Sequence, residues 1–182
     1  MTPANHEAFL KLIATTCLPE LGPGPRAGVR SNAALNKELD CFFADHKISS
    51  DIHATLRSAA LLWHDHLDDS HRLSQELHDP NGSFLHAIMH RREPDYGNAK
   101  YWFHRVGSHR AYGEIARNVE ALFATCDVSK AWRARLLNAG RWSPDAFVDL
   151  CEENAARPHS DPDYVFLQQV QAIEFEALLL TF

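Results

Sequence analysis

The chain has 182 residues, of which 45% are hydrophobic and 23% charged, and its formal net charge is −6. This length and composition are typical of a single globular domain over residues 1–182, and the acidic balance argues against nucleic acid as a general partner. Because no apolar run approaches the roughly 20 residues that cross a bilayer, and residues 1–10 lack the basic start of a signal peptide, we expect a cytoplasmic protein with no membrane partner.

The first part of the chain predicts three helices, over residues 3–17, 32–44 and 52–77. Pro3 can open the first helix, and the prolines and glycines of residues 21–26 predict a loop after it. Apolar residues at the 3.6-residue period indicate the second helix, which starts at Ser31 or Asn32. The third helix is the longest. Ser50 or Asp51 can cap its start, and turn residues at 79–82 end it.

The rest of the chain predicts further helices over residues 84–92, 98–106, 112–125, 130–138, 144–155 and 162–181. Ser83 and Ser129 are candidate N-caps, and Ser143-Pro144 and Asp161-Pro162 each combine an N-cap with proline at the first helical position. Strand signals are weak throughout. We therefore predict an all-α fold, a helical bundle or orthogonal array of about seven to nine helices.

The histidines are concentrated in one part of the chain. Eight of the twelve fall between His64 and His109, and imidazole is the side chain that titrates near neutral pH and binds metals most often. On the predicted helix over residues 52–77, His64, Asp68 and His71 are spaced by four and three, which places them on one stripe. A polar stripe at the edge of the core is where a helical bundle positions inward-facing ligands.

The predicted helix over residues 84–92 carries His86 and His90 at i and i+4, a spacing that lets two imidazoles converge on one ion. Exposed histidine pairs of this kind also occur by chance. Together with the stripe on the preceding helix, they make five candidate metal ligands: His64, Asp68, His71, His86 and His90. Zinc, iron(II), manganese or nickel would suit such a set. Without a metal, His64, Asp68, His71 and His90 could act as catalytic general acids and bases.

The charges around these histidines are unevenly spread. Residues 60–80 hold five acids and one arginine, whereas residues 86–110 hold five arginines and lysines and two acids. Either the two segments pair with each other, or the basic one forms the wall of a pocket for an anion. Arg91 and Arg92 either stabilise a helix C-terminus or grip a carboxylate or phosphate. Lys100, Tyr101 and Arg105 either belong to the core edge and surface or bind substrate.

Two resemblances bear on function. Residues 59–65, with the sequence Ala-Ala-Leu-Leu-Trp-His-Asp, end in an adjacent His64-Asp65 pair. They resemble the metal-binding helix of HD-type phosphohydrolases, which implies an all-helical metal enzyme acting on phosphate esters. That family also has an earlier histidine and a later aspartate. His46 and His53 lie close upstream in this chain, and no later aspartate stands out.

The second resemblance covers residues 63–109. The stretch HAIMHRREPDYGNAKYWF, starting at His86, and the Arg105-Val-Gly107 that follows resemble a group of uncharacterised bacterial and fungal proteins. Residues 142–150 and 168–178 are similar to the same group. This resemblance implies no particular reaction, but it falls on the same segment as the histidines.

The sequence therefore favours a metal-dependent hydrolase or lyase acting on a small anionic or polar molecule. The metal centre would use the five candidate ligands, and the substrate would be held by Arg91, Arg92, Lys100, Tyr101 and Arg105. No nucleotide cofactor is expected, because no Rossmann glycine pattern or P-loop is present. A non-enzymatic protein that binds an anionic ligand or partner, and a helical structural module, are the alternatives. The oligomeric state stays open.

Overall fold

A computed structural model describes residues 1–126 and 130–182. The described part contains α1 (Pro3–Ile13), α2 (Asn32–Asp45), the 3₁₀ turn η1 (Ser50–Ile52), α3 (His53–Trp63), α4 (Leu67–Ser74), α5 (Pro80–Arg92), α6 (Tyr96–Val106), α7 (Ala111–Phe123), α8 (Lys130–Leu136), β1 (Leu137–Asn138), β2 (Arg141–Trp142), α9 (Pro144–Asn154) and α10 (Pro162–Leu179). The predicted all-α fold is confirmed. The predicted cap Ser129 lies outside the described residues.

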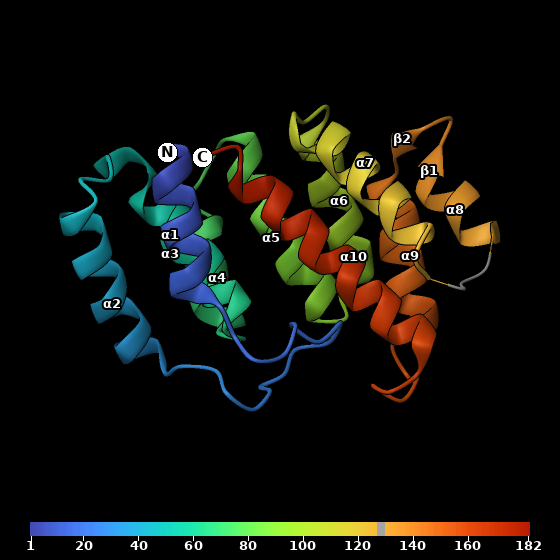
Figure 1. Ribbon diagram of the computed structural model, residues 1–182, viewed down its shortest axis with the longest axis horizontal. Coiled ribbons are helices and arrows are strands. Elements are labelled where there is room, and N and C mark those ends of the chain that lie inside the picture. Colours follow the sequence, from blue (N-terminus) through green and yellow to red (C-terminus); the bar gives the residue numbers. More distant parts are fainter. Residues whose placement is uncertain (127–129) are drawn as a thin grey trace.

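Helix α10 crosses the middle of the molecule, with α1 to α4 on one side and α7 to α9 on the other (Figure 1). Its residues are buried on most of its circumference, including Phe166, Val170 and Leu178, as expected of a helix surrounded by others. The two chain ends meet beside it, where the amino group of Met1 donates to the carbonyl oxygen of Phe182. None of the described helices is both long and apolar enough to cross a lipid bilayer.

Local capping sets most helix starts. The side chains of Ser143 and Asp161 accept backbone N–H bonds at the starts of α9 and α10, each followed by proline, as the sequence predicts. Helix α5 begins four residues earlier than expected, because Asp79 rather than Ser83 is its cap. Gly82 fits there for a steric reason: a Cβ on it would lie 2.2 Å from the Cβ of Leu77.

The prediction of one long helix over residues 52–77 is wrong. The chain forms two helices, α3 and α4, separated by residues 64–66, and Asp65 has a positive φ of 65°. Aspartate is among the few residues that adopt this left-handed conformation at low cost. The break is held by contacts with distant residues, since the buried Asp65 carboxylate pairs with Arg26 and Arg92. The break turns α4 away from the axis of α3, so His64 and His71 no longer share a stripe.

A short antiparallel hairpin follows α8, in place of the end of the helix predicted over residues 130–138. Leu137 pairs with Trp142 and Asn138 with Arg141. Residues Ala139 and Gly140 both have positive φ, 51° and 75°, as a two-residue hairpin turn requires. The hairpin packs against α7 and completes the end of the molecule that carries α8 and α9.

Candidate metal centre

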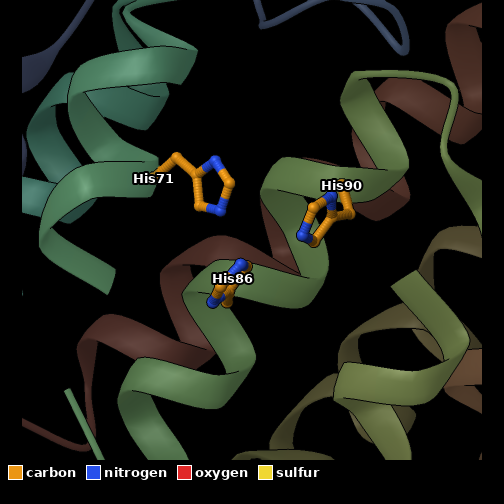
Figure 2. Close-up of side chains that lie close together, drawn as sticks. All are labelled: His71, His86 and His90. Atoms are coloured by element: carbon orange, nitrogen blue, oxygen red, sulfur yellow. The ribbon is translucent and has the colours of Figure 1, made fainter. Parts of the chain in front are cut away.

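Three histidines from two helices lie close together. Helix α4 carries His71, and α5 carries His86 and His90 on successive turns of one face. One ring nitrogen of each lies within 4.8 Å of the others, and the three rings face a common space between the helices (Figure 2). The structure thus gathers three of the five candidate ligands that the spacing predicted.

The rings are held by mutual contact and by one aromatic neighbour. Ring centroids are 4.6 Å apart for His71 and His86, 5.1 Å for His71 and His90, and 4.7 Å for His86 and His90. The other face of the site is formed by Trp102 of α6, whose ring stacks on His86 at 3.9 Å and 16°. The position of His86 is therefore fixed by contacts from both α5 and α6.

Burial keeps the rings of α5 uncharged. His86 and His90 are 3% and 6% exposed. Desolvation, with smaller contributions from His90 and His71, lowers the pKa of His86 to about 3, and desolvation followed by His71 lowers the pKa of His90. Neutral imidazole is the form that binds metal ions. Nδ1 of His86 and Nδ1 of His90 are buried and have no hydrogen-bond partner among the described residues.

The spacing of these nitrogens is close to that of a metal site. Two nitrogen ligands of a tetrahedral ion with bonds of ~2.1 Å lie about 3.4 Å apart, and the separations here reach up to 4.8 Å. A contraction of up to about 1.4 Å in these separations, within reach of small changes in side-chain torsion, would bring all three nitrogens to one ion.

A carboxylate and an amide that the sequence analysis did not single out adjoin His90. Glu93, at the C-cap of α5, places Oε2 at 3.4 Å from Nδ1 of His90. Asn98 of α6 places Nδ2 at 3.1 Å from Nε2 of the same ring. Desolvation, opposed by His71 and reinforced by Asp68 and Asp95, raises the pKa of Glu93. In the sequence, the only indication that Glu93 and Asn98 adjoin the site is that they follow His90 by three and eight residues.

Asp68 and His64 are not in the cluster. Asp68 is exposed on α4. His64 lies at the break between α3 and α4, where the backbone N–H of Arg30 donates to its Nδ1 at 3.2 Å and the Arg30 guanidinium lies 3.2 Å from its Nε2. His66 Nε2 donates to the carbonyl oxygen of Arg30 at 2.8 Å. The two histidines thus hold the backbone of Arg30, and this loop contact is what separates His64 from the other predicted ligands.

Arg91 and Arg92, which the sequence analysis offered as substrate-binding residues, are engaged in contacts inside the protein. Both are buried, with exposed fractions of 0% and 1%. Arg91 donates to Glu174 Oε2 at 2.7 Å and to Gln171 Oε1 at 3.3 Å on α10. Arg92 donates to Asp65 Oδ1 at 2.7 Å and to the carbonyl oxygen of Leu62 at 2.6 Å. Their contacts are internal, and they anchor α5 to its neighbours.

The remaining predicted substrate residues lie on α6. Lys100 forms an ion pair with Asp149 of α9. Tyr101 is 53% exposed. The Arg105 guanidinium lies over the rings of Tyr101 and Trp102, at 5.9 Å and 5.2 Å from their centroids, and it has no carboxylate partner in residues 1–126 and 130–182. One of the two alternatives was that the acidic segment 60–80 pairs with the basic segment 86–110. The ion pair between Asp65 and Arg92 joins these two segments. Lys100 instead pairs with Asp149, which belongs to neither segment.

Comparison with known proteins gives no relative: no family model matches the chain, and no curated protein or solved structure matches it either.

Proposed function

We propose that His71, His86 and His90 bind one divalent transition-metal ion, and that the protein is a hydrolase- or lyase-type enzyme for a small anionic or polar molecule. The observation that carries this proposal is the convergence of three imidazoles, one ring nitrogen of each lying within 4.8 Å of the others. Two of the rings, His86 and His90, are buried, and their Nδ1 atoms make no hydrogen bond with the described residues. Three protein ligands leave a coordination position for water or substrate, as in catalytic zinc sites.

The chemistry of the ligands narrows the choice of metal. Imidazole suits zinc, iron and nickel, whereas manganese prefers oxygen ligands. Because the acid Asp68 is outside the cluster, the set is all nitrogen, which favours zinc, iron(II) or nickel over manganese. A bound ion of this kind would lower the pKa of a coordinated water or polarise a carbonyl group.

Glu93 is the candidate general base beside this centre. Its Oε2 lies 3.4 Å from Nδ1 of His90, about the separation of two ligands that share one tetrahedral ion. The carboxylate therefore has the reach either to become a fourth ligand or to accept a proton from a water in the open position.

Tyr101 and Arg105 are the candidate substrate-binding residues. Of the five predicted, Arg91 and Arg92 are buried and Lys100 is paired. Arg105 lies over the ring of Trp102, and the same ring stacks on His86. The Arg105 guanidinium has no acidic partner among the described residues, and the Trp102 ring connects it to the histidine cluster. The same arginine would serve the alternative function, a non-enzymatic protein that binds an anion.

Metal analysis of protein purified without a histidine tag tests the proposal. We expect one equivalent of zinc, iron or nickel after loading and desalting. The His71→Ala and His86→Ala variants should lose it, because two imidazoles bind an ion far more weakly than three. The matched control is His78→Ala, which removes an exposed histidine between α4 and α5. Loaded wild-type protein without stoichiometric metal would refute the metal centre.

The open coordination position has its own test. In the cobalt(II)-substituted protein, acetate should change the visible d–d spectrum if the ion keeps an exchangeable ligand. The Arg105→Gln variant should need several times more acetate for the same change. A spectrum insensitive to acetate would identify a closed structural site instead of an enzyme centre.

A further inference from the structure

A small cavity lies where the end of α1, the end of α3 and the C-terminal part of α10 meet. It has a volume of about 120 Å³, and its lining includes Ile13, Thr15, Trp63, Phe175 and Glu176. Figure 1 shows that α10 approaches α1 at its C-terminal end. None of the residues that line it belongs to the proposed metal centre.

Two aromatic side chains form one wall of the cavity. The rings of Trp63 and Phe175 have centroids 4.9 Å apart and an interplanar angle of 43°, and both residues are more than nine-tenths buried. The indole Nε1 donates to Thr15 Oγ1 at 3.1 Å, which fixes the ring. That oxygen also accepts from Arg26, and its hydroxyl donates to the carbonyl oxygen of Cys17, so the hydroxyl is already engaged.

The one acidic residue of the lining lacks a counter-ion. Glu176 makes no side-chain hydrogen bond or ion pair with any residue that the structure describes. Desolvation by the surrounding protein raises the pKa of its carboxyl group, and no nearby cation offsets that effect. Arg26, the nearest arginine to Thr15, is paired with Asp65. Glu176 is an exposed residue, so its carboxylate is a solvent-accessible negative charge beside the two aromatic rings, with no cation paired to it among the described residues.

We propose that this cavity binds the ammonium group of a small alkylamine. A cation is attracted to the faces of tryptophan and phenylalanine rings, and Glu176 would supply the opposite charge. The volume corresponds to about four waters at ~30 Å³ each, which is enough for a methylated ammonium group and too little for a whole metabolite. The net charge of −6 also favours cations over anions at the surface.

Titration with tetramethylammonium chloride, followed by the ¹H–¹⁵N resonance of the Trp63 indole, tests this inference. The resonance is assigned with Trp63→Phe, and sodium chloride holds the ionic strength constant. We expect a saturable shift with a millimolar dissociation constant. Glu176→Gln should weaken binding by about five- to tenfold, because it removes the charge and keeps the shape. Glu152→Gln, which removes an exposed acid of α9, is the control and should bind like wild type.

tert-Butanol, which has a similar shape and no charge, separates cation binding from simple filling of an apolar hole. It should shift the indole resonance far less than tetramethylammonium. The inference fails if the alcohol binds equally well, if Glu176→Gln retains full affinity, or if no saturable shift is seen. Because none of these readouts involves a metal, the result does not depend on the fate of the metal centre.

Discussion

The ring nitrogens of His64 and His71 meet different surroundings although the two residues are only seven positions apart. His64 accepts a backbone N–H from Arg30 and is 1% exposed, whereas His71 is half-buried and faces His86 and His90. Two histidines at helical spacing therefore differ in chemistry, because the groups within hydrogen-bonding distance of each ring determine what that ring can bind.

Asn98 is expected to select the nitrogen of His90 that faces the metal. An amide can present its oxygen instead of its nitrogen after a half-turn. With the oxygen toward His90 Nε2, it would accept that N–H and leave Nδ1 free to bind. Asn98→Leu should lower metal affinity by roughly 10- to 100-fold, measured by competition with a chelator, while Asn98→Asp should retain it. Equal affinities in all three proteins would exclude this role.

The pKa of His64 predicts a specific acid sensitivity. Burial, with Arg30 and Arg26, lowers it from 6.5 to about 4, so between these two values the unfolded chain binds more protons than the folded one. The stabilisation is complete above pH 6.5 and is lost as the pH falls toward 4. On acidification through this window, wild type should lose about 1–2 kcal/mol more unfolding free energy than His64→Gln.

Urea unfolding at several pH values measures this difference, and His78→Gln, which changes an exposed histidine, is the control. The two variants should diverge only below about pH 6.5. If His64→Gln loses as much stability on acidification as the control variant, the buried ring of His64 is not responsible.

At the level of secondary structure, the break between α3 and α4 is the feature on which the candidate metal centre depends. Its charges are deeply buried: the side chains of Asp65, Arg26 and Arg92 are 0%, 5% and 1% exposed. Gly24 passes so close that a Cβ on it would lie 2.8 Å from Asp65 Oδ2. The break therefore joins the loop after α1, the end of α3 and the C-terminal end of α5 in one ionic cluster.

Asp65→Asn tests how much this cluster contributes. Asparagine also adopts positive φ, so the change removes the charge and spares the backbone, leaving two buried guanidinium groups without their carboxylate. We expect a loss of about 3–5 kcal/mol in the free energy of unfolding. Asp40→Asn is the matched control. It breaks the ion pair between the exposed Asp40 and Arg57 and should cost less than ~1 kcal/mol. Equal losses would mean that the cluster is not the source of the break's stability.

At the scale of the whole molecule, charges inside the core hold α5 where it meets α4. Arg91 is buried against Glu174 of α10, with the Phe147 ring 4.3 Å from its guanidinium carbon. Arg92 connects the same helix to Asp65 and to the carbonyl oxygen of Glu20. Two adjacent arginines at one helix end thus fix α5 to α10 on one side and to the α3–α4 break on the other. This arrangement sets the distance between His71 and the histidines of α5.

The sequence by itself determined what depends on local interactions. Periodicity and N-caps such as Ser143 and Asp161 predicted an all-α fold, because helix formation and capping act over a few residues, and the i, i+4 spacing of His86 and His90 identified the face of α5 that carries the candidate site. Only the tertiary structure decided the rest. The segment around Asp65 favours a continuous helix locally, and it is interrupted by Arg26, Arg30 and Arg92, which are far away in sequence. The same long-range contacts removed His64 from the cluster and buried the two arginines, since a charge finds its partner in three dimensions and its neighbours along the chain do not reveal that partner.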